Sequence, residues 1–312
     1  MVSWHKPAGS ISSADYDVVV SPGDPDWVHT GLRVANLAAG ESRTIETGDQ
    51  EFVIVPLAGR RVQVSSEPDE VELVGRTDVF AGPTDVAYVP RGRTLTVTAS
   101  EPSRVAFCSA VAGSDQRFAV VTLDHVPVEL RGAGNASRQV HNFATPAVLQ
   151  ADSIICCEVL TPGGNWSSYP PHKHDEERPG VETELEEIYY FEARTEPGGP
   201  ASAQPHGYQA VHGTPERPID VDARVVSGDV VLVPHGWHGP SMAPPGYDLY
   251  YLNVMAGPGP ERAWRICDDP AHGWVRDTWP DQQLDPRLPF RAHDRPRKDR
   301  TDDTTNDPEE AR

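Results

Sequence analysis

Cysteine, methionine and long apolar runs are scarce in this sequence. Its 312 residues include four cysteines and three methionines, and two of the cysteines, Cys156 and Cys157, are adjacent. Adjacent cysteines do not form a disulfide framework, so we expect a buried strand at this position and a reducing, cytoplasmic location. No run approaches the ~20 apolar residues of a membrane-spanning helix. The first residues contain no apolar signal core, so the sequence predicts neither membrane insertion nor secretion.

Basic residues are also in short supply. The chain has 27 lysines and arginines against 47 aspartates and glutamates, for a net charge of −20. This balance argues against binding to nucleic acid or to an anionic membrane surface. No glycine-rich phosphate loop followed by a helix is present, so we expect no organic cofactor. A small-molecule partner remains, and the sequence is compatible with a homo-oligomer.

Turn-forming residues are abundant and Val-rich segments are short. The sequence holds 31 prolines and 26 glycines, which indicates an all-β chain of many short strands. Residues 85–94 and 229–238 share the pattern Asp-Val-x-x-Val-Pro-x-Gly, and residues 51–55 match residues 187–191 as a glutamate followed by apolar residues. We interpret these matches as a duplicated β-barrel unit. Its expected parts are residues 1–125, residues 126–285 and a disordered tail over 286–312.

Four side chains of the second copy form the pattern of a metal site. His172 and His174 are two residues apart and would share one face of a strand. Glu187 opens a β-branched and aromatic strand segment, and His238 follows a Pro/Gly turn. Imidazole and carboxylate ligands suit Zn, Mn or Fe. The alternative, scattered surface histidines, explains neither the glutamate nor the late histidine.

Only the second copy carries these histidines. Thr94 occupies the position that matches His238, and no His-x-His motif precedes Glu51. We therefore expect one divalent metal ion per chain, held in the second copy, and a first copy that serves as scaffold.

These motifs lie in stretches that resemble a known family. His172, His174, Glu187 and Gly228 to His238 resemble the two cupin motifs. Residues 131–140, 171–175, 185–190 and 246–257 look like the 5-deoxy-glucuronate isomerase family of myo-inositol catabolism, which is related to 4-deoxy-L-threo-5-hexosulose-uronate ketol-isomerase of pectin breakdown. The resemblance covers roughly residues 20–280. It implies a bicupin, a duplicated jelly-roll barrel, whose metal is held by His172, His174, Glu187 and His238.

The ligand set retains alternatives. The segment between His174 and Glu187 is longer than in most cupins, so Glu184 or Glu186 could replace Glu187. In the same way, His235 could compete with His238. We favour Glu187 because it directly precedes the Ile-Tyr-Tyr strand, where the cupin glutamate usually lies.

The resemblance implies conversion of 5-deoxy-D-glucuronate to 5-dehydro-2-deoxy-D-gluconate, an aldose–ketose isomerisation. A base must reach the C2 proton, and the candidates are Glu186, Tyr189 and Tyr251. The substrate carboxylate needs a cation, for which Arg138 is our choice, with Asn135 beside it. Two alternative functions use the same fold: an Fe(II) cupin dioxygenase and a non-catalytic sugar-binding bicupin.

Overall fold

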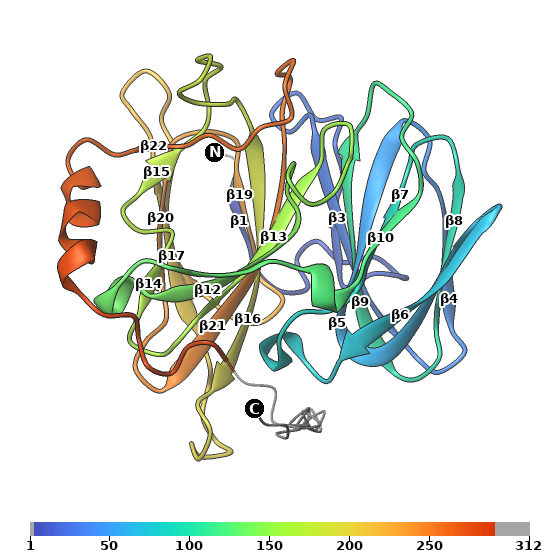
Figure 1. Ribbon diagram of the computed structural model, residues 1–312, viewed down its shortest axis with the longest axis horizontal. Coiled ribbons are helices and arrows are strands. Elements are labelled where there is room, and N and C mark those ends of the chain that lie inside the picture. The colour runs from blue at the N-terminus through green and yellow to red at the C-terminus, as the bar shows by residue number, and fades with distance from the viewer. Residues whose placement is uncertain (1–2, 291–312) are drawn as a thin grey trace, which may run out of the picture.

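Antiparallel strands form two barrels that lie side by side (Figure 1). The computed structural model describes residues 3–290. The first barrel is a nine-stranded sheet, order β10-β7-β5-β9-β3-β2, with β4, β6 and β8 attached through β5 and β8. Its strands are β2 (Val18–Val20), β3 (Thr30–Leu37), β4 (Ser42–Glu46), β5 (Gln50–Ser66), β6 (Asp69–Arg76), β7 (Val86–Val89), β8 (Thr94–Ala99), β9 (Ser103–Val111) and β10 (Ala119–Val121).

The second barrel is built from two sheets. A seven-stranded sheet has the order β1-β19-β16-β21-β13-β12-β11, and a six-stranded sheet has the order β18-β17-β20-β15-β22, with β14 paired to β20. The strands are β1 (His5–Lys6), β11 (Val128–Arg131), β12 (Arg138–Ala144), β13 (Ile155–Thr161), β14 (Trp166–Ser167), β15 (His172–Lys173), β16 (Glu186–Thr195), β17 (Gly207–His212), β18 (Asp220–Val225), β19 (Val230–Val233), β20 (Trp237–Met242), β21 (Tyr247–Ala256) and β22 (Cys267–Asp268).

Helical structure in the described part of the chain consists of four 3₁₀ segments: η1 (Val79–Ala81), η2 (Leu123–His125), η3 (Gly134–Ala136) and η4 (Gly273–Asp281). No helix among residues 3–290 is long and apolar enough to cross a membrane. These elements confirm the predicted all-β fold with two barrels.

The first barrel closes because β5 bends. The first half of this strand pairs with β7 and β9, and the second half pairs with β6 and β8. At the bend, Gly59 has φ 103°, and a Cβ there would lie 2.2 Å from Ser103 Oγ, so only glycine fits. The buried side chains of this interior, including Phe52, Ile54 and Phe107, form an apolar cluster.

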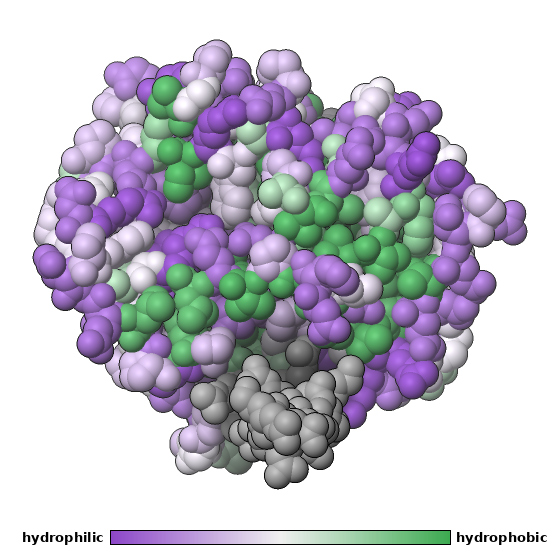
Figure 2. Space-filling model, viewed as in Figure 1, coloured by the Kyte–Doolittle hydropathy of each residue, from purple (hydrophilic) through white to green (hydrophobic). Residues whose placement is uncertain are grey.

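A second apolar cluster fills the junction between the two barrels. It joins side chains of the first barrel, such as Val53 and Tyr88, to Ile188 and Tyr250 of the second. A buried ion pair crosses this junction: Arg76 donates to both carboxylate oxygens of Glu158, at 2.6 and 2.7 Å. On the face shown in Figure 2, apolar residues gather across the middle, from one barrel to the other, with hydrophilic residues around them.

The N-terminal segment crosses to the second barrel. His5 and Lys6 pair with Val231 and Val230 of β19, and the Nε2 of His5 lies 2.9 Å from Asp229 Oδ2. The predicted domain limit at residues 125–126 falls between β10 and β11 and stays a prediction. Of the predicted tail, the described part includes Phe290, whose N–H donates to Gln139 Oε1. Residues 291–312 lie outside the described residues.

The strand register reveals how the copies correspond. Phe52 pairs with Val89 in the first barrel, and Glu187 pairs with Val233 in the second. Val89 and Val233 occupy the same place in the repeated Val-Pro-x-Gly pattern. Phe52 is therefore the counterpart of Glu187, and Glu51 is the counterpart of Glu186. The match of Glu51 with Glu187 was wrong by one residue, because it aligned two glutamates instead of two barrel-facing positions.

Candidate metal centre

Three elements of the second barrel bring the predicted ligands together. β15 carries His172 and leads directly to His174, β16 carries Glu187, and β20 carries His238. His172 and His238 are direct partners in the pairing of β15 with β20. The β16 strand approaches from the other sheet, so the site lies between the two sheets, inside the barrel.

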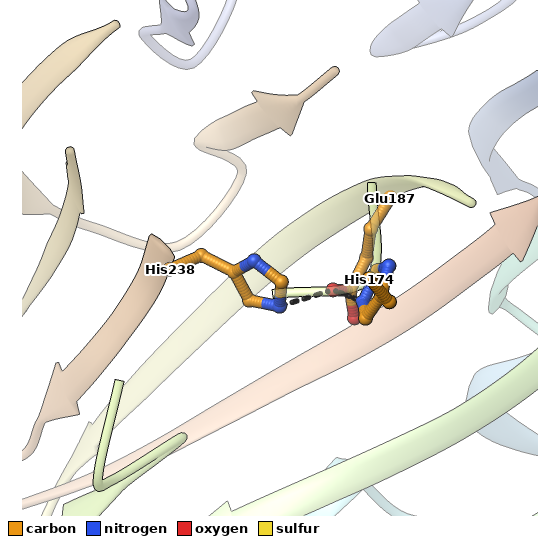
Figure 3. Close-up of side chains that lie close together, drawn as sticks. All are labelled: His174, Glu187 and His238. Atoms are coloured by element: carbon orange, nitrogen blue, oxygen red, sulfur yellow. Dashed lines mark hydrogen bonds and ion pairs between the residues drawn. The ribbon is translucent and has the colours of Figure 1, made fainter. Parts of the chain in front are cut away.

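His174, Glu187 and His238 form a compact group (Figure 3). One ligand atom from each lies within 4.8 Å of the others, and all three side chains are buried. The Oε2 of Glu187 is 3.1 Å from the Nε2 atoms of both histidines. This spacing allows one carboxylate and two imidazoles to share a single ion.

The protein backbone orients the histidine rings. Nδ1 of His174 lies 3.1 Å from the carbonyl oxygen of Leu185, and Nδ1 of His238 lies 3.1 Å from that of Gly236. Nδ1 of His172 lies 3.3 Å from the carbonyl oxygen of Pro170. A carbonyl partner accepts the proton on Nδ1 and so assigns Nε2 as the atom that would bind a metal. Burial would lower the pKa of His174, but Glu187 raises it, so a metal would replace a proton on this Nε2.

The electrostatics fit a divalent cation. Burial would raise the pKa of Glu187, but contacts with His174 and His238 lower it to about 2, so the carboxylate is charged. Burial and the two neighbouring histidines hold the pKa of His172 well below its usual value, so this ring is neutral. The buried Nε2 of His238 makes no well-aligned hydrogen bond among the described residues, and its near neighbour is the Oε2 of Glu187 at 3.1 Å. An orphaned nitrogen beside a charged carboxylate is the donor set that a divalent metal requires.

The structure separates the favoured ligands from their alternatives. Glu184 and His235 line a surface cavity of about 260 Å³ and do not belong to the compact group. Glu186 points to the opposite face of β16, where Val28, His29 and Thr30 donate hydrogen bonds to it.

His172 lies beside the compact group, outside its three members. Its ring centroid is 4.5 Å from that of His238 and 6.4 Å from that of His174.

Two tyrosines face the same interior. Ser168 Oγ lies 3.2 Å from the Tyr189 hydroxyl and 3.0 Å from the Tyr251 hydroxyl, so the three groups form a chain. The ring of Tyr189 is 6.1 Å from that of His238. Burial raises the pKa of both phenols, with the nearby charge of Glu187 adding to the shift at Tyr189. Both tyrosines are therefore protonated at neutral pH and can donate to an oxygen in the barrel.

Sequence reasoning missed Ser168. Within residues 3–290 it is the one residue other than glycine with positive φ, at 45°, and this unusual backbone turns its hydroxyl toward the two tyrosines. A serine in a Ser-Ser-Tyr-Pro loop carries no signal of such a conformation.

Arg138 is a buried cation without a charged partner. Its Nη1 donates to the carbonyl oxygen of Ala136 at 3.0 Å, its guanidinium lies 5.5 Å from the ring centroid of Trp279, and no described carboxylate pairs with it. Burial, together with the positive charges of Arg131 and Arg276, lowers its pKa to about 10. On β12 it shares the face of Val140, which packs in the barrel interior. Arg138 is therefore a buried guanidinium that makes no ion pair within the described residues.

Asn135 lies elsewhere. It is exposed on η3 and lines a surface cavity of about 310 Å³ together with Trp166, Tyr169 and Trp279. The structure does not bring it to the histidine cluster.

Known proteins resemble this chain along most of its length. The 5-deoxy-glucuronate isomerase of Geobacillus kaustophilus is 42% identical over 276 residues, 87% of this chain and 95% of that protein. The protein of the same name from Bacillus subtilis strain 168 is 38% identical over 258 residues, 82% of this chain and 91% of that protein.

Solved structures agree with the fold. The crystal structure of an IolB-like protein from Salmonella typhimurium matches with a TM-score of 0.78 and 34% identity, over 88% of this chain and 99% of that one. Oxalate decarboxylase from Lactobacillus farciminis matches with a TM-score of 0.56 and 11% identity, over 84% and 90%, which shows the fold alone. The sequence pattern described as the KduI/IolB family matches residues 4–275. The chain therefore belongs to the KduI/IolB family.

Proposed function

We propose that this protein is a metal-dependent aldose–ketose isomerase that interconverts 5-deoxy-D-glucuronate and 5-dehydro-2-deoxy-D-gluconate in myo-inositol catabolism. The observation that carries the proposal is the buried His174–Glu187–His238 group in a chain whose relatives are named 5-deoxy-glucuronate isomerase. The unpaired guanidinium of Arg138 in the same barrel supports an acidic sugar as the substrate.

The chain supplies a complete set of groups for one ion. His174, Glu187 and His238 would hold it, with His172 beside them as the fourth ligand. When bound, a divalent metal supplies Lewis acidity, which stabilises the negative charge that develops on the O1 and O2 atoms of the sugar during isomerisation. The first barrel holds apolar Phe52 at the position of Glu187, so we expect one ion per chain.

The remaining polar groups of the barrel interact with the sugar oxygens and with the substrate carboxylate. We assign to the protonated phenols of Tyr189 and Tyr251, which Ser168 joins, hydrogen-bond donation to the sugar oxygens on which negative charge develops. Arg138 would bind the carboxylate at the far end of the sugar, because a buried guanidinium gains most from a charged partner. Glu186 is already bound by four donors and is not retained as the base.

A reducing compartment also suits this protein. Its four cysteines are free thiols, three of them buried, which supports a cytoplasmic enzyme. Recovery of the native protein from an oxidising compartment during cell fractionation would contradict this location.

An anaerobic assay tests the proposed reaction. Purified protein is expected to convert 5-deoxy-D-glucuronate to the ketose under nitrogen, and a chelator is expected to abolish turnover until a divalent ion is restored. Elemental analysis should find one ion per chain. Turnover that requires O₂ would favour the dioxygenase alternative, and sugar binding without turnover would favour the binding-protein alternative. Full activity after complete metal removal would exclude the metal mechanism.

Two substitutions should separate binding of the substrate carboxylate by Arg138 from the role of the Tyr251 phenol in the transition state. Arg138→Met is expected to raise KM by about 10- to 100-fold with little change in kcat, because a charged hydrogen bond present in substrate and transition state alike contributes uniform binding. Tyr251→Phe is expected instead to lower kcat by roughly 10²-fold or more. Tyr190→Phe is the control, since its hydroxyl faces away from the barrel and donates to Glu192. Steady-state kinetics on all three variants provide the measurement, and a kcat of Tyr251→Phe equal to that of Tyr190→Phe would remove Tyr251 from this role.

A further inference from the structure

The two barrels hold each other through a pair of equivalent carboxylates. Glu186 accepts hydrogen bonds from the N–H groups of Val28, His29 and Thr30, at 3.0, 2.7 and 2.6 Å. The Thr30 hydroxyl adds a fourth bond, at 2.9 Å. These donors belong to the first barrel, whereas Glu186 begins β16 of the second barrel.

Glu51 makes the reciprocal contact. At the start of β5 in the first barrel, it accepts bonds from the N–H groups of Asp152, Ser153 and Ile154, at 2.9, 2.7 and 2.6 Å. These three residues immediately precede β13 of the second barrel. Both carboxylates therefore bind three consecutive N–H groups of the other barrel at nearly identical distances, as an internal twofold symmetry requires.

The position after each carboxylate distinguishes the two contacts. In the first barrel Glu51 is followed by Phe52, which packs in an apolar interior. In the second barrel Glu186 is followed by Glu187, whose Oε2 lies 3.1 Å from His174 and His238. Successive strand residues point to opposite faces, so fixing the Glu186 carboxylate outside the barrel fixes the backbone from which Glu187 points inward.

β16 has no earlier strand residue to support this end. Glu186 is its first residue, and Glu187 lies between β19 on one side and β21 on the other. Pairing of Glu186 with Ala256 and a bond from the Leu185 N–H to the His174 carbonyl oxygen hold one side of this end. A metal ligand must keep its position to a fraction of an ångström, so a restraint on the other side matters. The bonds from residues 28–30 supply that restraint.

We propose that Glu186 is a positioning residue through which the first barrel holds Glu187 in place for the metal ion. The inference rests on the metal site of the proposed function. It gives the first barrel, which has an apolar interior, a role at the centre of the second. Contacts around a metal ligand commonly change metal affinity by about 10- to 100-fold when they are removed.

The internal symmetry provides a matched control for the test. Glu186→Gln and Glu51→Gln each weaken one inter-barrel contact to three consecutive N–H groups. Because Glu51 also accepts from the Tyr88 hydroxyl at 2.5 Å, we expect Glu51→Gln to lower the thermal unfolding temperature at least as much as Glu186→Gln. Only Glu186→Gln should raise the dissociation constant for Zn²⁺, by about 10-fold or more, as measured by competition with a chromogenic chelator on the full chain. The visible absorption of the Co²⁺-substituted protein should also change in this variant alone, because it reports the ligand geometry.

The outcomes separate this inference from the proposed function. If the parent protein binds no ion, both are overturned. If the parent binds an ion and the two variants bind Zn²⁺ with dissociation constants within about threefold of each other, the positioning role alone is overturned. Should Glu186→Gln fail to fold, Thr30→Val replaces it, because it removes one hydroxyl donor and leaves the carboxylate in place. Ser153→Ala then replaces Glu51→Gln; it removes a hydroxyl that lies 3.3 Å from Glu51 and donates to the carbonyl oxygen of Val111 at 2.6 Å. The same comparison of Zn²⁺ affinity then decides the question.

Discussion

Replacing Glu187 with Gln is expected to empty the metal site and to lower kcat/KM by at least about 10³-fold, equivalent to roughly 4 kcal/mol of transition-state stabilisation. The glutamine keeps the shape of the side chain but loses the charge that balances a divalent ion between His174 and His238. Metal content after growth in metal-replete medium and turnover under nitrogen should fall together. His172→Ala should also lower metal content and turnover, because it removes the proposed fourth ligand.

Glu184→Gln is the control for this experiment. Glu184 lies three residues earlier, partly exposed and outside the histidine cluster, so its loss of charge should leave metal content and turnover close to those of the parent. If Glu184→Gln loses the ion while Glu187→Gln retains it, the ligand assignment is wrong. If Glu187→Gln retains activity after chelation, the metal itself is dispensable.

Arg76→Met is expected to lower the free energy of unfolding by about 3–5 kcal/mol, because it leaves the buried carboxylate of Glu158 without its cation. Glu158 also receives hydrogen bonds from His141, at 2.6 Å, and Tyr250, at 2.8 Å, which do not replace a full charge. Burial would raise the pKa of Glu158, but Arg76 and His141 lower it to about 2. Its contribution to stability is therefore complete above the unfolded pKa, near 4.5, and is lost as the pH falls toward 2.

Arg61→Met provides the comparison in denaturant titrations. Arg61 and Glu72 form an exposed ion pair at 2.9 Å on the first barrel, with both side chains about half exposed or more. Its loss should cost at most about 1 kcal/mol. The double variant Arg76→Met/Glu158→Gln should recover part of the loss, since it removes the uncompensated charge. Equal destabilisation by Arg76→Met and Arg61→Met would show that the buried pair does not hold the barrels together.

The fold and much of the site were predictable because both depend on local periodicity. Alternation along a strand predicts that His172 and His174 share a face; in the structure β15 ends at Lys173, and His174 joins the compact group while His172 lies beside it. The repeated Val-Pro-x-Gly pattern indicates a duplication. The contacts of Glu186 were not predictable, because its donors at residues 28–30 are more than 150 positions away in the sequence. Because Glu186 adjoins the proposed ligand Glu187, the sequence suggests it as a candidate base. The structure directs its side chain out of the barrel, toward residues 28–30.

The alignment of the copies failed for a related physical reason. Matching Glu51 with Glu187 relied on residue identity. The two barrels instead correspond in which strand positions face inward, whatever the residue type at each position. Phe52, Ile54 and Phe107 fill the interior of the first barrel, and that apolar alternation was the better guide. The burial of Arg138 without a carboxylate partner was equally invisible, since a sequence does not show which charges remain unpaired.

The pairing of β1 with β19 has a consequence for biosynthesis. His5 and Lys6 leave the ribosome more than two hundred residues before their partners Val231 and Val230. The last strand of the first barrel ends at Val121, so this barrel can fold before the β19 partners of His5 and Lys6 have been synthesised. The second barrel then gains as its edge strand a segment that was made before the first barrel. A cut between the barrels would therefore deprive the later one of a strand that its own portion of the gene does not encode.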